Sequence, residues 1–238
     1  MKRGLFPLGI LLLLFLFSWK VEAQSGPTVV LTFDDATASQ RTVVAPLLQR
    51  YGFGATFFVC EFPGFENKEQ YMTWEQIRQL ADMGFEIGNH TRSHGAMSQQ
   101  TPEQITEEIA YIEERCRQEG IPQPVTFAYP GYNFSAEGIA ILQERGYRYA
   151  RHGGDKPYVA GTDPWMVPSY AIHEKDDRTL DFLRSILDPM TAQDTVVLCF
   201  HGVPDLAHDW VTTTPRHFKA MMKYLRRRDC RVIALRDL

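Results

Sequence analysis

Apolar runs of strand length alternate with segments of helical periodicity along most of this chain. Residues 29–33 and 55–60 are runs of apolar and β-prone residues, and between them the apolar positions of residues 40–51 recur at helical spacing. Runs without polar alternation favour strands buried on both faces, as in a parallel sheet that is covered by helices. The pattern therefore predicts repeated β-then-α units.

The same rhythm continues to the C-terminus. Capping-box patterns at Thr73–Gln76 and Thr101–Gln104 predict helices that end at Gly84 and Gly120. Further strands are predicted at 85–88, 125–129, 147–151, 167–172, 195–200 and 231–235, and further helices at 135–145, 180–187 and 215–227. Seven or eight such units in one domain predict an α/β fold, a (β/α) barrel of about seven parallel strands.

The first residues have the pattern of a secretory signal peptide. Lys2 and Arg3 precede an apolar run over residues 5–19, and a small-residue cleavage site follows at Ala23. We therefore predict a signal peptide over 1–23, a single domain over 24–238, and export to the periplasm or the extracellular side of the cell envelope. The alternative is an uncleaved membrane anchor, although the run is shorter than the roughly 20 residues that a spanning helix needs.

Charge and cysteine content exclude two other classes. The formal charge of −4 becomes −6 when the predicted signal peptide, with three basic residues and one acidic residue, is removed. No basic surplus remains to neutralise phosphates, so a nucleic-acid partner is not expected. The sequence has no CxxC pair, the spacing typical of a zinc knuckle. The four cysteines allow three disulfide pairings, which stay open: Cys60, Cys116, Cys199 and Cys230.

Polar, chemically active residues follow four of the predicted strands, where a (β/α) barrel places its chemistry. Asp34-Asp35 follow the first strand. Adjacent carboxylates repel each other, and burial raises the cost, so a bound cation is the simplest compensation. The other strand ends carry His90 to His94, Tyr129-Pro-Gly-Tyr132 and His201-Gly202.

A pair of histidines four residues apart completes a candidate metal site. The spacing of His90 and His94 places them on one face of any helical turn. Two imidazoles and one carboxylate suit zinc or another first-row divalent ion and leave positions for water. The alternative interpretation is a pair of solvated loop histidines.

Taken in order, these motifs resemble those of the polysaccharide deacetylases, the NodB-homology domains of carbohydrate esterase family 4. The resemblance runs from about Pro27 to Leu238 and rests on Thr32-Phe-Asp-Asp35, His90-Thr-Arg-Ser-His94, the Pro-containing turn and Leu198-Cys-Phe-His201. It implies a distorted (β/α) barrel, NodB-like, as the catalytic domain. It also implies a hydrolase that removes N-acetyl groups from N-acetylglucosamine-containing polysaccharide, chitin-like or peptidoglycan-like.

The resemblance also implies roles for individual residues. Asp34 would be the base that takes a proton from a metal-activated water, and His201 would be the acid that protonates the leaving amine. The backbone N–H of Gly131 would help hold the oxyanion. One divalent ion would be bound by Asp35, His90 and His94. Zinc is the simplest choice, and the same ligands also accept cobalt, nickel or manganese. Taken without the resemblance, His201 is open to a second interpretation, a buried structural histidine.

The chain departs from the family pattern at one position. Ala128 stands where an arginine that orients the base is expected, and the aspartate that usually partners that arginine is not evident. Either Arg151 or another nearby cation restrains Asp34 from a different strand, or Asp34 is held by the water alone. The alternative for Arg151, His152 and Asp155 is a polar loop at the pocket mouth.

Aromatic residues near the strand ends are candidates for stacking on sugar rings, Tyr132 and Trp210 above all, with ordinary packing as the alternative. In the loop that carries Trp210 we expect Asp205, His208 and Asp209 to be solvated.

Two rival functions remain. One is a deacylase of another amide or of an O-acetyl ester, and the other is a glycan-binding pseudoenzyme, which the missing arginine motivates.

Overall fold

The computed structural model describes residues 25–238, so the predicted signal peptide lies outside the described residues. Its strands are β1 (Thr28–Phe33), β2 (Thr56–Val59), β3 (Glu86–Asn89), β4 (Thr126–Ala128), β5 (Tyr149–Arg151), β6 (Tyr170–Ala171), β7 (Thr195–Phe200) and β8 (Arg231–Ile233). All their pairings are parallel, in the order β5-β4-β3-β2-β1-β7-β6. The predicted distorted barrel of about seven parallel strands is confirmed.

The strand predicted at 167–172 is split between the two edges of the sheet. Val167 forms a parallel bridge with Arg151 at the end of β5, whereas Tyr170 and Ala171 pair with β7. Pro168 lies between the two parts and has no N–H to donate, which explains the interruption. The segment thereby links the edges of the curled sheet.

A second distortion lies at the centre of the sheet. β7 pairs with all six residues of β1, but the other edge of β1 is shared. β8 pairs with its first half, Thr28 to Val30, and β2 with its last two residues, Thr32 and Phe33. At its end β1 therefore has β2 on one side and β7 on the other, and Asp34 and Asp35 follow between these two strands.

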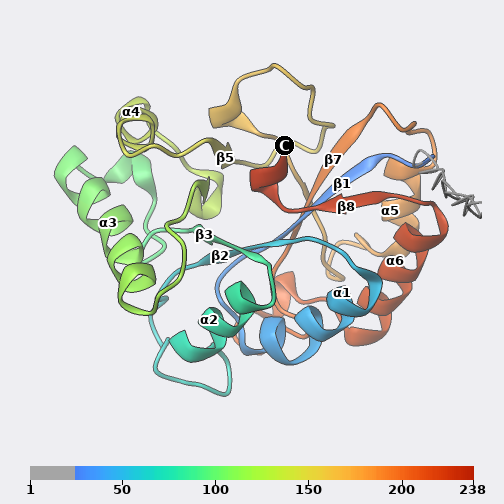
Figure 1. Ribbon diagram of the computed structural model, residues 1–238, viewed down its shortest axis with the longest axis horizontal. Coiled ribbons are helices and arrows are strands. Elements are labelled where there is room, and N and C mark those ends of the chain that lie inside the picture. Colours follow the sequence, from blue (N-terminus) through green and yellow to red (C-terminus); the bar gives the residue numbers. More distant parts are fainter. Residues whose placement is uncertain (1–24) are drawn as a thin grey trace, which may run out of the picture.

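Helices cover the outside of the curled sheet (Figure 1). They are a π-helical turn (Gln40–Val44) that continues into α1 (Ala45–Tyr51), α2 (Trp74–Asp82), α3 (Pro102–Gln118), α4 (Ala136–Glu144), α5 (Leu180–Leu187) and α6 (Pro215–Arg227). Both predicted capping boxes, at Thr73 and Thr101, are formed. Within the described chain, no helix has the length and apolarity to cross a membrane.

The floor beneath the end of β1 is aromatic. Phe33 stacks on Phe57 and Phe200 from the neighbouring strands, with ring centroids 5.1 and 5.4 Å apart. Phe218 of α6 meets the Phe33 ring edge-on at 5.9 Å. This fully buried layer fixes the backbone from which Asp34 projects.

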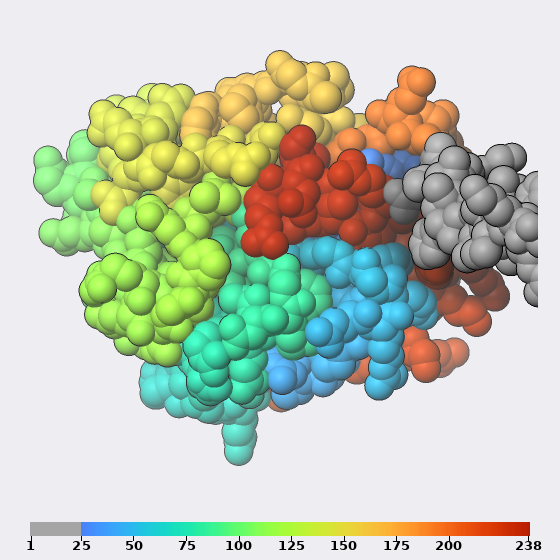
Figure 2. All heavy atoms as spheres, in the orientation of Figure 1, coloured from blue at the N-terminus to red at the C-terminus, as the bar shows by residue number. Residues whose placement is uncertain are grey.

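The opposite end of the sheet is closed by the C-terminal turn, Leu235–Asp237. Its backbone donates from Leu235 N to Thr56 Oγ1 (2.8 Å) and from Arg236 N to Glu86 Oε2 (2.9 Å). Figure 2 shows this segment in red on the surface, beside the N-terminal third of the chain. The amino ends of the strands are thus occupied, and the carboxyl ends are left to form a site.

Candidate active site

Asp34 and Asp35 lie in a tight turn directly after β1. Asp34 N donates to Phe200 O (2.9 Å), and Gln40 Nε2 donates to Asp34 O (2.5 Å). Asp35 and Ala36 have left-handed φ angles of 70° and 51°, a conformation that non-glycine residues keep only where the surroundings fix it. The two residues are 3% and 4% exposed and line one cavity.

Asp35 meets the two predicted histidines. Its Oδ1 lies 3.5 Å from His90 Nε2 and 3.6 Å from His94 Nε2, and all three ligand atoms lie within 4.8 Å of one another. Zinc bonds of roughly 2.0–2.1 Å to nitrogen and oxygen put tetrahedral ligands about 3.3 Å apart. His90 Nδ1 lies 2.7 Å from Ala128 O, so the proton is on Nδ1 and Nε2 keeps its lone pair for the site. The arrangement fits a divalent cation.

The segment that carries the two histidines is not a helical turn. Thr91 and His94 have left-handed φ angles of 63° and 58°, and the segment has no helical assignment. Asn89 Oδ1 accepts from Thr91 N (2.9 Å), and Thr91 Oγ1 accepts from His94 N (3.1 Å). This tight loop still brings the imidazoles of His90 and His94 edge to face, with centroids 4.7 Å apart.

Burial shapes the protonation of the three groups. Burial and the neighbouring charge of Asp34 raise the pKa of Asp35 to about 7, while burial lowers the pKa of His90 to about 4 and of His94 to about 3. The imidazoles are neutral at pH 7, the form in which they bind metals, and a cation would stabilise the Asp35 carboxylate.

Arg151 reaches Asp34 from β5. Its Nη2 donates to Asp34 Oδ2 at 2.5 Å, and its guanidinium lies 5.4 Å from the ring centroid of Phe58 and 5.5 Å from that of Tyr132. Burial would raise the pKa of Asp34, but the charge of Arg151 leads the effects that outweigh it and bring the pKa to about 2. Ala128 is the direct register partner of Arg151 across β4 and β5.

His201 follows β7 and faces the same carboxylate pair. Its Nε2 lies 3.8 Å from Asp35 Oδ2, and its carbonyl accepts from Gln40 Nε2 at 3.4 Å. Burial lowers the pKa of His201 to about 4. The imidazole is therefore neutral at pH 7.

The loop after His201 differs from the sequence-based expectation. The prediction that Asp205 and His208 are solvated is wrong, because these residues are 4% and 8% exposed, whereas Asp209 is exposed as expected. His208 Nδ1 lies 3.5 Å from Asp205 Oδ1 and 3.9 Å from Asp35 Oδ2. The Asp-x-x-His spacing was the available signal, since Asp205 Oδ1 accepts from His208 N in a local turn (2.7 Å).

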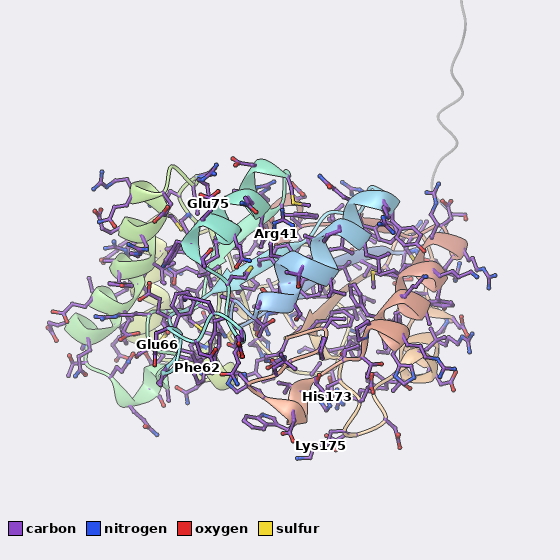
Figure 3. The ribbon with its side chains drawn as sticks, turned by 90° about the horizontal axis from the view of Figure 1, so that it is seen from below. Arg41, Phe62, Glu66, Glu75, His173 and Lys175 are labelled. Atoms are coloured by element: carbon purple, nitrogen blue, oxygen red, sulfur yellow. The ribbon has the colours of Figure 1, made fainter. Side chains whose placement is uncertain are left out.

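A cavity of about 310 Å³ lies over this constellation. Its walls include Tyr132 and Trp210, which are 36% and 51% exposed, and Gly131 in a left-handed conformation with φ of 55°. Phe62 and His173 also line it, and Figure 3 shows both on the same side of the molecule, in the connections after β2 and β6. The cavity thus offers aromatic faces around a buried polar centre, a combination typical of ligand sites.

Cys60, Cys116 and Cys199 are buried free thiols, so none of the disulfide pairings left open by the sequence is formed among the described residues. Cys199 Sγ lies 3.4 Å from Asp34 Oδ2 and accepts from Arg151 Nη1 at 3.3 Å. Cys60 Sγ lies 3.8 Å from Asp35 Oδ1. Both thiols pack behind the carboxylates.

Comparison with known proteins shows the family of this chain. The sequence model of the polysaccharide deacetylase family matches residues 22–150, more than half of the chain. The chain belongs to the polysaccharide deacetylase family, as the motifs predicted, and the predicted enzyme class is the one for which this family is named.

Two Bacillus proteins are similar in sequence. "Putative polysaccharide deacetylase YxkH" of Bacillus subtilis is 27% identical over 145 residues, which cover 61% of this chain and 50% of that protein. Peptidoglycan-N-acetylglucosamine deacetylase of Bacillus cereus is 28% identical over 132 residues, 55% of this chain and 58% of that protein. The matched region spans about half the length of these curated relatives.

Solved structures share the fold at lower identity. The Bc1960 peptidoglycan N-acetylglucosamine deacetylase, bound to an N-hydroxybenzamide, has a TM-score of 0.64 at 17% identity over 90% of each chain. The Xyl-CE4 domain of a xylanase from the hindgut metagenome of Trinervitermes trinervoides has a TM-score of 0.61 at 17% identity over 89% of each chain. These likenesses show the fold.

Proposed function

We propose that the protein is an exported, divalent-metal-dependent hydrolase that removes N-acetyl groups from N-acetylglucosamine-containing polysaccharide. One observation carries the proposal. The Asp35, His90 and His94 cluster shares a single cavity with Asp34, which is ion-paired to Arg151. A ligand set beside a separately restrained carboxylate is the arrangement that metal-assisted hydrolysis needs.

The metal would be held by Asp35 Oδ1 and by the Nε2 atoms of His90 and His94. A divalent ion bound there supplies Lewis acidity for an amide carbonyl and lowers the pKa of water. Zinc suits these ligands best, and cobalt, nickel and manganese are also compatible with them.

Asp34 is suited to accept a proton from the attacking water. Its Oδ2 is held by Arg151, whereas its buried Oδ1 has no hydrogen-bond partner among the described residues. The lowered pKa, about 2, keeps this carboxylate ionised at neutral pH. One oxygen is therefore oriented by the protein and the other is left for the substrate water.

His201 and Gly131 complete the proposed machinery. His201 faces the carboxylates from β7, where its imidazole can protonate the leaving nitrogen, and the N–H of Gly131 is the proposed oxyanion donor. Because His201 is neutral at rest, it first receives a proton: Asp34 takes one from the attacking water, and that proton passes through His201 to the leaving nitrogen, so one proton is taken up and one is delivered.

The rim supports a sugar substrate, since Tyr132 and Trp210 present partly exposed rings beside the polar centre. The same residues also serve a deacylase of another amide or of an O-acetyl ester. The motive for a glycan-binding pseudoenzyme is weaker, because Arg151 contacts Asp34 although Ala128 is not an arginine.

Acetate release tests the proposal. The purified protein is incubated with acetylated chitooligosaccharides, acetylxylan and peptidoglycan, with and without a chelator. The proposal predicts acetate from the N-acetylated sugars and its loss with the chelator. Release from acetylxylan alone would favour the O-acetyl esterase, and release from none would favour the binding module.

A further inference from the structure

The outer face of α6 carries basic charge only. Residues 215–227 contain five lysines and arginines and no acidic residue, and all five cations are exposed. With a turn of about 100° per residue, the five side chains fall within an arc of about 100°, on the side of the helix away from its buried residues. These five residues form the basic face of α6: Arg216, Lys219, Lys223, Arg226 and Arg227.

The protein does not neutralise the basic face. None of the five cations forms an ion pair with an acidic side chain of the described residues. Two carboxylates beside α6 contact other residues of that helix. Asp188 Oδ1 accepts from Tyr224 Oη at 2.5 Å, and Glu174 Oε1 lies 2.8 Å from His217 Nδ1. Residues 24–238 carry a formal charge of −6, so without the basic face the rest carries −11. Unpaired cations gathered on one side of an acidic domain give a local positive potential that attracts anions.

The neighbouring helix α1 adds no negative charge to this surface. α6 packs against α1 and α5 on the outside of the sheet (Figure 1). The π-helical turn and α1 together, residues 40–51, contain no acidic residue. Arg50, near the end of α1, is exposed and has no ion pair among the described residues. On the side of α1, therefore, neither helix brings a carboxylate to the basic face.

The first described residues contact the end of α6. Ser25 N donates to Asp229 Oδ2 (2.9 Å), and Gly26 N donates to Asp229 O (3.2 Å). A Cβ atom at Gly26 would lie 2.2 Å from Arg228 O, so glycine is needed for this close approach. In the sequence, five residues separate Ser25 from the apolar run over residues 5–19. The apolar run that predicts passage through a membrane is thus joined to the domain beside the end of α6.

We propose that the basic face binds the headgroups of anionic phospholipids, at the surface of the membrane across which the chain is predicted to pass. Clusters of roughly four to eight lysines and arginines on an amphipathic helix are typical of such binding. β1 runs from the end of the sheet next to Ser25 to Asp34, so the cavity lies at the opposite end and faces away from the lipid. The binding does not depend on the proposed catalytic activity, so either proposal can fail without the other.

Partition onto vesicles provides the first test. The protein, purified as it is exported, is sedimented with vesicles of phosphatidylcholine alone and with vesicles of equal parts phosphatidylcholine and phosphatidylglycerol. The ratio of the two partition coefficients cancels any contribution of the N-terminal segment that is common to both. The proposal predicts a ratio of at least ten at about 0.1 M salt and a ratio near one at about 1 M salt, where charges are screened. A ratio near one at the lower salt concentration would overturn the proposal.

Matched charge deletions locate the binding surface. One variant removes three cations of the basic face, and the control removes three exposed, unpaired cations from the segments around β5 and β6, so both lose the same net charge. They are Lys219→Gln/Lys223→Gln/Arg226→Gln and Arg148→Gln/Lys156→Gln/Lys175→Gln. The vesicle ratio should fall to near one in the first and stay within twofold of the wild type in the control. Equal losses in both, or no loss in the first, would overturn the assignment to α6.

A single substitution decides the matter if the triple variant does not fold. Lys223→Gln lies in the middle of the basic face, and glutamine is a good helix former. This variant should lower the vesicle ratio about fivefold, the usual effect of one cation near an anionic surface. An unchanged ratio would count against the basic face.

Soluble polyphosphate separates a lipid surface from a dissolved anionic polymer. Binding of the wild type to polyphosphate and to the phosphatidylglycerol vesicles is compared at equal concentrations of phosphate. The proposal predicts tighter binding to the vesicles. Tighter binding to polyphosphate would overturn it and would assign the basic face to an anionic polymer instead.

Discussion

The Arg151 guanidinium lies 2.5 Å from Asp34 Oδ2, and both side chains are buried. The contact crosses from β5 to the end of β1, although the family pattern places the arginine on β4 at the position of Ala128. Ala128 and Arg151 are register partners on neighbouring strands. The arginine of this chain therefore lies one strand away from the family position, at the same level of the sheet. This relationship explains how the chain keeps a restrained carboxylate.

Replacement of Arg151 should lower the activity of the enzyme and raise the pKa of the proposed base, Asp34. Arg151→Met should lower kcat roughly 100-fold through misplacement of Asp34. It should also raise the pKa of Asp34 from about 2, so the acid limb of the pH–rate profile moves to higher pH. Arg148→Met, at an exposed position of the same segment, is the control. An acid limb that does not move would argue against this role.

Relocation of the arginine is a sharper form of that test. Arg151→Ala alone should be nearly inactive, and Ala128→Arg/Arg151→Ala should regain part of the lost activity, because both positions lie at the same level beside Asp34. The comparison is made by kcat at equal metal content. A double variant no better than Arg151→Ala would contradict the equivalence of the two positions.

His201 should matter most for poor leaving groups. His201→Ala should slow release of acetate from N-acetylated chitooligosaccharides by about 10²–10⁴-fold, the usual contribution of a general acid. Hydrolysis of 4-nitrophenyl acetate should change only a few-fold, since its leaving group needs no proton. Parallel assays on the two substrates check this, and equal losses on both would point to a structural role for His201.

Glu86 should make stability depend on pH. It is 2% exposed and accepts from Thr56 Oγ1, Thr126 Oγ1 and Arg236 N, and burial raises its pKa. The folded state then binds a proton more tightly than the unfolded state, so its contribution to stability is lost as the pH rises through the raised pKa.

Urea unfolding at several pH values checks this expectation. The variant Glu86→Gln keeps an acceptor for Arg236 N and should show a smaller fall in the free energy of unfolding between pH 5 and pH 8 than the wild type. Glu75→Gln, on the exposed face of α2, should behave like the wild type. If the three proteins show the same slope, Glu86 does not titrate in this range.

Local sequence signals predicted most of the fold and the centre of the site. Apolar runs predicted the strands, and the capping residues Thr73 and Thr101 predicted the starts of two helices. The polar residues that follow β1 and β3 meet in one cavity. These features depend on short-range pattern and on the rule that strand ends converge.

Other features depend on contacts between distant segments. The Arg151–Asp34 pair requires the β4–β5 register and the curl of the sheet, which no local pattern encodes. His208 was expected in solvent, but its loop folds back onto the site, where His208 packs against Phe62 with ring centroids 5.0 Å apart. Pro168 marks the split of the strand predicted at 167–172, but the curl of the sheet decides which edge each half joins.

Metal content and acetate release on N-acetylated chitooligosaccharide, measured together, show whether the proposed metal-dependent hydrolysis takes place. The wild type should contain one divalent ion and release acetate. Asp34→Asn should keep the ion and lose turnover, whereas His90→Ala should lose both, and His217→Ala at the start of α6 should lose neither. A wild type that binds no metal, or an Asp34→Asn variant with full activity, would rule out the proposed mechanism.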